Sequence, residues 1–147
     1  MEKYKIARQV ITHYESFSAT CFLKSSGVTA IGYGRTCGNM IRTSEKEEDM
    51  WLTSKLFSLN LLIDNEVKGY ITQAQIAALM SFIYDLGEGT FRMSPLLKML
   101  NSKDRDMQKI ADEILCWSKT GQYVVPAMAK RRMTEYLLFT TGQMNLF

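Results

Sequence analysis

Glu15 is the residue around which chemistry could be organised. It stands in "HYESFSATCFLKSSGVTAIGYGRT", residues 13–36, where an amphipathic segment gives way to one punctuated by glycine. A carboxyl group can donate or accept a proton in catalysis. It can equally be an exposed charge at a helix end, or the ion-pair partner of Arg131 or Arg132. The residues alone leave these interpretations open.

Other reactive residue types do not assemble into a site. His13 is the single histidine and has no ligand-type neighbours at metal-site spacing, so we expect no metal and no cofactor. Gly27, Gly32 and Gly34 lack the following helix start and Lys-Ser/Thr pair of a phosphate-binding loop, and we interpret them as turn and close-packing glycines. The stretch "AKRRMTEYLLF" predicts a core-facing helix rather than a nucleic-acid surface.

Length and composition predict one globular domain over residues 1–147, with 46% hydrophobic content. The net charge of +3 is interleaved along the chain, which indicates a mildly basic surface that tolerates an anionic polymer as partner without requiring one. We find neither a signal peptide nor an apolar run of the roughly 20 residues that span a membrane. We therefore expect a protein that is cytoplasmic as synthesised. We also expect it to be a monomer.

The cysteine pattern indicates a reducing compartment. Cys21, Cys37 and Cys116 have no CxxC spacing, and their odd number leaves one thiol unpaired in any intramolecular arrangement. Whether Cys21 and Cys37 pair stays open, because the sequence does not give their separation in space.

Helical periodicity dominates the chain. Residues 3–14 place apolar and aromatic side chains near one stripe, which predicts an N-terminal helix ending close to Glu15. Residues 16–39 combine Ser, Thr and Gly with β-branched and aromatic neighbours, and "GVTAIGYG" predicts a strand preceded by a turn. This segment should form a small β-lobe.

The later helices carry start and stop signals. The capping-box spacing predicts helix starts after Ser44 and after Thr72, and the second helix, "ITQAQIAALMSFIYDLG", is apolar enough to be central and buried before Gly87 stops it. Ser94 is expected to cap a helix that begins at Pro95. Two further helices are predicted, one within "DMQKIADEILCWSK" before Gly121 and one after Pro126.

These elements predict an α+β fold that is mainly helical, with a small N-terminal β-lobe and a helical lobe. Ligands are usually bound in the cleft that such a two-lobed shape leaves. Glu15 would lie at the junction.

Five segments follow one another in order: "ES", "SGVTAIGYGRT", "TQAQIAALMSFIYDLG", "SPLLKMLN" and "RRMTEYLLF". This ordered set resembles the phage-type lysozymes, the endolysin family of bacteriophages, which hydrolyses bacterial peptidoglycan and has Glu-Gly where this chain has "ES". The segments cover nearly the whole chain. The resemblance implies a lysozyme-like fold, peptidoglycan as the polymer in the cleft, and a substrate site that includes Gly32 and Tyr33. Reaching a cell wall would need a separate release or export route.

Two of the three catalytic positions depart from the family pattern. In that family a glutamic acid after the first helix is the general acid, with an aspartate nine residues later and a threonine six beyond it. Glu15 occupies the acid position, but Lys24 and Ala30 occupy the other two, and neighbouring Thr29 should point to the opposite face of its strand. We interpret Lys24 as a solvated lysine of the β-lobe.

The departures affect a transition state that gains positive charge at the sugar. Reversing one charge about 6 Å away, at an effective dielectric of 20, changes the barrier by about 5 kcal/mol, or roughly four powers of ten in rate. The sequence therefore predicts a degenerate lysozyme homologue with muramidase activity lost or strongly reduced, retained to bind peptidoglycan or an unknown protein partner.

The alternative is an active muramidase with Glu15 as general acid. Asp85, where the family usually has asparagine, or Glu88 could supply a displaced second carboxylate; a bound water or the substrate's N-acetyl group could also assist Glu15. Asp85 pointing into the cleft within about 10 Å of Glu15 would favour this alternative on carboxylate-separation grounds. A cleft closed by Lys24 would favour the binding module.

Overall fold

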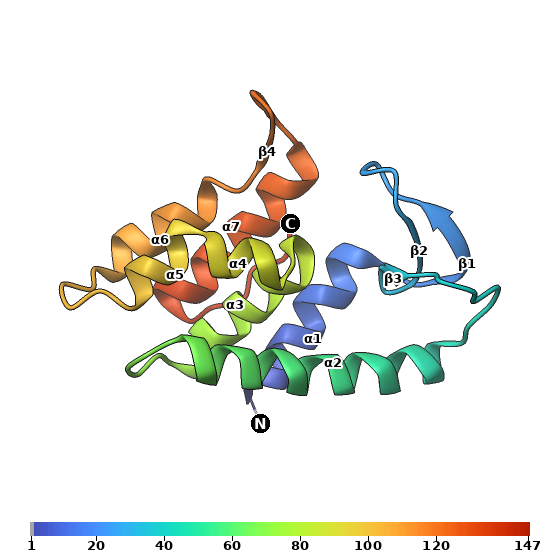
Figure 1. The fold of residues 1–147 in the computed structure, drawn as a ribbon, viewed down its shortest axis with the longest axis horizontal. Coiled ribbons are helices and arrows are strands. Elements are labelled where there is room, and N and C mark those ends of the chain that lie inside the picture. The colour runs from blue at the N-terminus through green and yellow to red at the C-terminus, as the bar shows by residue number, and fades with distance from the viewer. Residues whose placement is uncertain (1) are drawn as a thin grey trace.

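The computed structural model describes residues 2–147 as a mainly helical protein with two small antiparallel sheets (Figure 1). The elements in chain order are α1 (Glu2–Glu15), β1 (Ser18–Leu23), β2 (Thr29–Gly32), β3 (Arg35–Thr36), α2 (Glu45–Glu66), α3 (Gln73–Leu86), α4 (Glu88–Met93), α5 (Pro95–Leu100), α6 (Met107–Leu115), β4 (Lys119–Thr120), β5 (Tyr123–Val124) and α7 (Pro126–Thr141). The sheet β1–β2–β3 lies at one end of the molecule and helices α5 and α6 lie at the other (Figure 1). Among the helices of residues 2–147, none combines the length and the apolar character needed to cross a membrane.

The β-lobe forms where the sequence predicts it. β2 pairs with β1 on one side and with β3 on the other, both antiparallel, so β2 is the central strand. Ala30 lies opposite Phe22 of β1 and Thr36 of β3. A bulge in β1 between Ser18 and Phe22 shifts the register there. The central position of β2 explains why it is buried although it has only four residues.

α3 is the central helix, as its almost continuous apolar sequence predicts. It contacts α1, α2, α4 and α7, and its residues 75–83 are all buried. Its start is a full capping box, in which the Thr72 hydroxyl accepts from the Gln75 backbone N–H and the Gln75 side chain accepts from the Thr72 N–H. Because α3 is surrounded by other elements, polar groups from those elements can meet beside it. The candidate site lies where they meet.

Ser94 is the N-cap residue of α5 and Pro95 is its first residue, as predicted. The Ser94 hydroxyl makes no capping hydrogen bond, however, because it donates to the carbonyl of Phe91 in the preceding helix, 2.7 Å away. The helix predicted within residues 106–119 is α6, which stops at Leu115. The β4–β5 hairpin that residues 119–124 form around Gly121, whose φ is +65°, was not predicted. Glycine adopts such a φ at no steric cost, which the tight turn of this hairpin requires.

Candidate active site

Glu15 is the last residue of α1 and points into the protein. Its side chain is only 8% exposed, and its Oε2 accepts a hydrogen bond from Nη1 of Arg131 on α7 at 2.6 Å. Of the interpretations left open by the sequence, the structure therefore selects an ion pair with Arg131 over an exposed charge. A buried carboxylate with a buried partner has a fixed position, which any acid–base role would require.

Lys24 lies at the end of β1 and takes the other oxygen of the same carboxylate. Its Nζ lies 3.5 Å from Oε1 of Glu15, and its side chain is one-third exposed. The prediction of a solvated lysine is wrong in this respect, because the ammonium faces the acid position. Glu15 therefore has a cation at each of its two oxygens.

The turn between β2 and β3 packs directly on this pair. A Cβ at Gly34 would overlap Oε1 of Glu15 and approach Nζ of Lys24, so only glycine fits there, at φ +90°. The preceding residue, Tyr33, is held by Tyr84 of α3, whose hydroxyl donates to the Tyr33 carbonyl at 2.6 Å. Burial, and then the charge of Glu15, raise the pKa of the Tyr84 hydroxyl, which therefore remains a hydrogen-bond donor.

Ala30 and Thr29 lie on opposite faces of β2, as strand geometry predicts. Ala30 is 1% exposed, whereas Thr29 is exposed to solvent. The Thr29 hydroxyl therefore does not take the place of the one that is missing at position 30.

Asp85 lies near the end of α3 in a network with the last helix. Its Oδ2 is 2.9 Å from Nη2 of Arg132 and its Oδ1 is 3.8 Å from Nη1 of Arg131. Arg132 also donates to both oxygens of Glu135, at 2.6 and 2.9 Å, and the Ser81 hydroxyl donates to Glu135 at 2.9 Å. The helix predicted from "AKRRMTEYLLF" is core-facing, since Arg131, Arg132 and Glu135 are all buried.

The network alters the acid–base behaviour of its buried members. Burial alone would lower the pKa of Arg131, but the carboxylates of Asp85, Glu15 and Glu135 more than offset it and raise that pKa. Burial raises the pKa of Glu135, and the charges of Arg132 and Arg131 oppose the rise. Arg131 therefore stays cationic between its carboxylate partners.

Asp85 and Glu15 lie close together because they share Arg131. Both contact the same Nη1 atom, at 3.8 and 2.6 Å, so their oxygens are no more than about 6.4 Å apart. The distance condition set for Asp85 as a second carboxylate is met. Its orientation is toward the two arginines, however, and Glu88 instead approaches Lys55 and Arg92 at the surface.

Gly32 lies against a buried ion pair that sequence reasoning missed. A Cβ at Gly32 would overlap the carboxylate of Glu48, which is fully buried in the first turn of α2. Glu48 accepts from Nε and Nη2 of Arg35 at 2.9 and 2.7 Å, and from the Thr43 hydroxyl at 2.7 Å. Acidic residues in the first turn of a helix are usually exposed and interact with the helix dipole. Nothing in the sequence pattern therefore marks Glu48 as a buried residue.

Ser16 follows Glu15 in a left-handed conformation with φ +56°. A non-glycine residue in this conformation destabilises the folded state by about 1–2 kcal/mol relative to glycine. A change to glycine recovers only part of that free energy, because glycine also raises the conformational entropy of the unfolded chain. We expect Ser16→Gly to raise the free energy of unfolding by about 0.5–1 kcal/mol in urea denaturation. Ser25→Gly, in the β1–β2 turn where φ is not positive, is the matched control and should give no gain; equal effects of the two changes would contradict the explanation.

A disulfide closes the β-lobe. Cys21 of β1 is bonded to Cys37 after β3, across 16 residues of sequence, and Cys116 is a free, exposed thiol. The question left open by the sequence, whether Cys21 and Cys37 pair, is answered by this bond. The closed loop contains Lys24, Ala30 and Gly34, so it includes the whole β-lobe side of the candidate site.

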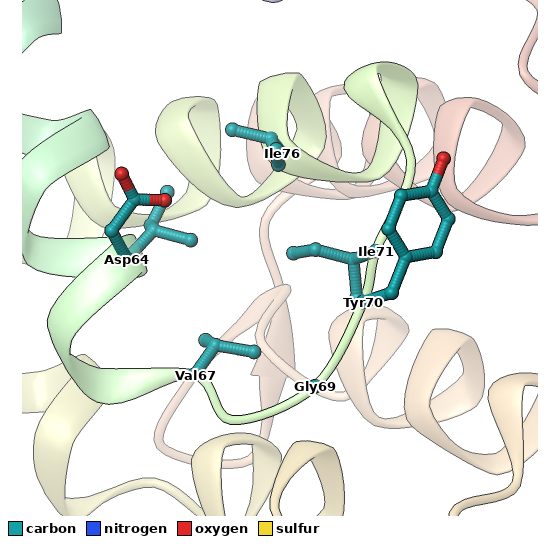
Figure 2. A pocket seen from close by; sticks show the side chains of 7 residues that line it. Asp64, Val67, Gly69, Tyr70, Ile71 and Ile76 are labelled. Carbon is teal, nitrogen blue, oxygen red and sulfur yellow. The ribbon is translucent and has the colours of Figure 1, made fainter.

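A separate hollow of about 300 Å³ lies at the end of α2 and the start of α3 (Figure 2). Aliphatic side chains of α2, of the segment after it and of α3 line it together with Asp64 and the exposed Tyr70. None of the residues predicted to act in chemistry lines it, so we do not assign the candidate site there.

The residues of the candidate site lie within the part of the chain that matches a known protein family. The model of the phage lysozyme family matches residues 12–135, which include Glu15, Lys24, Ala30, Asp85 and Arg131. The chain belongs to the phage lysozyme family. The resemblance noted in the sequence is thus confirmed at the level of the family and the fold.

Individual relatives and one solved structure match this chain over different shares of their own length. An endolysin of Acyrthosiphon pisum secondary endosymbiont phage 1 is 28% identical over 90% of this chain and 94% of its own length. An endolysin of Bacillus phage B103 is 42% identical over 55% of this chain, but the match spans only 30% of that protein. The muramidase domain of SpmX from Asticaccaulis excentricus superposes with a TM-score of 0.79 at 28% identity, over 92% of this chain and 95% of that chain.

Proposed function

We propose that this phage lysozyme homologue has lost most or all muramidase activity and retains its cleft to bind peptidoglycan or a protein partner. The observation that carries the proposal is the Lys24 ammonium, 3.5 Å from the Glu15 carboxylate, at the position where the family has its second catalytic carboxylate.

The reasoning follows from what glycoside hydrolysis requires. One carboxyl group must present a proton to the leaving oxygen, and a second carboxylate must activate water or attack the sugar. Both oxygens of Glu15 face cations, Lys24 and Arg131, and a lysine ammonium cannot act as the second carboxylate. The positive charge that develops on the sugar would meet Lys24 rather than an anion, which raises the barrier by several kcal/mol.

A second candidate, an active muramidase, is favoured by the short Glu15–Asp85 separation. Their oxygens are no more than about 6.4 Å apart, an upper limit that allows the roughly 5–5.5 Å separation of retaining glycosidases. This candidate requires Asp85 to leave Arg132, at 2.9 Å, and Lys24 to move into solvent. These two changes break existing ion pairs, so we place the candidate second.

Release of soluble muropeptides from purified peptidoglycan tests the proposal. We expect wild type to release none above background, and Glu15→Gln to be equally silent. The double change Lys24→Asp with Ala30→Thr should gain activity, because it returns a carboxylate and a hydroxyl to the two positions where the family has its catalytic aspartate and threonine.

Glu15-dependent digestion by the wild-type protein would contradict the proposal. In that case Asp85→Asn should abolish the digestion if Asp85 is the second carboxylate.

Cosedimentation of the wild type with purified sacculi separates the two versions of the proposal, since a protein-binding module need not cosediment, whereas a glycan-binding one must.

A further inference from the structure

Six charged side chains of alternating sign form a continuous chain through the site, which we call the charge chain. Its members in spatial order are Lys24, Glu15, Arg131, Asp85, Arg132 and Glu135. The successive nitrogen–oxygen distances are 3.5, 2.6, 3.8, 2.9 and 2.6 Å. The charge chain runs from the partly exposed Lys24 to the fully buried Glu135.

We propose that the charge chain is a clasp between the two lobes, in which Lys24 and Asp85 are energetically coupled although they do not touch. In this proposal Asp85 is a positioning residue for Arg131, rather than a reserve catalytic carboxylate. The inference goes beyond the proposed function, because it concerns how the site is held together, whether or not the cleft hydrolyses a glycan.

The geometry at Arg131 supports the coupling. Its Nε donates to the Ser81 hydroxyl at 3.2 Å and its Nη2 to the Ser81 carbonyl at 3.3 Å, so the guanidinium is anchored to α3. The remaining Nη1 is shared by Glu15 and Asp85. Because the guanidinium cannot follow either carboxylate freely, the charge near one of them must affect the other.

Charge balance explains why Lys24 and Asp85 belong together. Lys24 supplies a second cation for Glu15, so that Arg131 is left able to serve Asp85 as well. Glu15, Asp85 and Glu135 already contact Arg131, and an acidic residue at position 24 would add a fourth carboxylate at the Glu15 side of this group. Charges of like sign at these separations repel strongly where water is largely excluded.

Of the six members, only Lys24 comes from the β-lobe. Glu15 ends α1, Asp85 is on α3, and the other three are on α7. The Lys24–Glu15 pair therefore attaches the β-lobe to the helical lobe at the acid position. A ligand group that reaches Oε1 of Glu15 must first displace the Lys24 ammonium.

Thermal unfolding of Lys24→Asp in two backgrounds tests the coupling. We expect Lys24→Asp to lower Tm by about 6 °C or more when Asp85 is present, and by less than half as much in the Asp85→Asn background. The difference should shrink in 1 M NaCl, because salt screens the repulsion. If the Asp variant does not fold, Lys24→Met with and without Asp85→Asn gives the same cycle in a milder form.

The matched control is Asp104→Asn, which removes an exposed carboxylate from the loop before α6. It should leave the Tm loss of Lys24→Asp unchanged. Equal losses in the wild-type and Asp85→Asn backgrounds would overturn the proposal, whatever the muropeptide assay shows. A silent wild type together with an uncoupled pair would reject the clasp and keep the proposed function.

Discussion

Glutamine in place of Glu135 is expected to lower the free energy of unfolding by about 3–5 kcal/mol, the largest effect of any change discussed. Glu135 is fully buried, accepts two hydrogen bonds from Arg132 and one from Ser81, and lies 3.9 Å from Nε of Arg131. A neutral amide of the same shape leaves the buried Arg132 charge without its main counter-ion. Urea denaturation at neutral pH measures the loss.

Two further variants show whether burial causes the Glu135 effect. Glu66→Gln breaks an ion pair of similar length, 3.2 Å to Arg92, in which both side chains are substantially exposed, and should cost no more than about 1 kcal/mol. Replacing Arg132 and Glu135 together by Met and Leu should recover much of the loss, because neither charge of the fully buried pair then remains. The partly exposed Asp85 loses Arg132 but keeps Arg131 at 3.8 Å. A loss for Glu135→Gln as small as that for Glu66→Gln would show that the buried pair contributes little.

Alanine in place of Gly32 is expected to destabilise the protein by about 3–4 kcal/mol. The φ of +64° costs a non-glycine residue about 1–2 kcal/mol, and the added Cβ would also overlap the buried Glu48 carboxylate. Moving Glu48 weakens its hydrogen bonds to Arg35 and Thr43, and hydrogen bonds to charged groups are worth about 1.5–3 kcal/mol each.

Gly38 is the matched control for Gly32. It has a similar φ of +55°, but a Cβ there would meet nothing within 4 Å. Gly38→Ala should therefore show the backbone cost alone, about 1–2 kcal/mol in the same urea assay. Equal losses at the two positions would rule out the overlap with Glu48 as the cause.

The helical part of the fold was predictable because its signals are local. Thr72 and Gln75 cap α3 through atoms three residues apart, and the end of α1 at Glu15 follows from one amphipathic stripe. The β4–β5 hairpin was not predictable in the same way. Each of its strands has only two residues, too few for an alternating pattern to appear.

The site was predictable only in part, because its contacts join distant segments. Glu15 was singled out, and Arg131 was among the partners considered for it. Whether Lys24 turns toward Glu15 or toward solvent depends on the β-lobe's position against α1, which no local pattern encodes. The Cys21–Cys37 bond escaped prediction for the same reason, since strand pairing brings its two ends together.

The Glu15–Arg131 hydrogen bond joins residues 116 positions apart. Contacts of such separation form late in folding, because the intervening chain must first be brought together. During synthesis at about 5–20 residues per second, Glu15 leaves the ribosome roughly 6–23 s before Arg131 does. The nascent chain therefore holds this carboxylate without its arginine for that interval, and the site is completed only when the last helix docks.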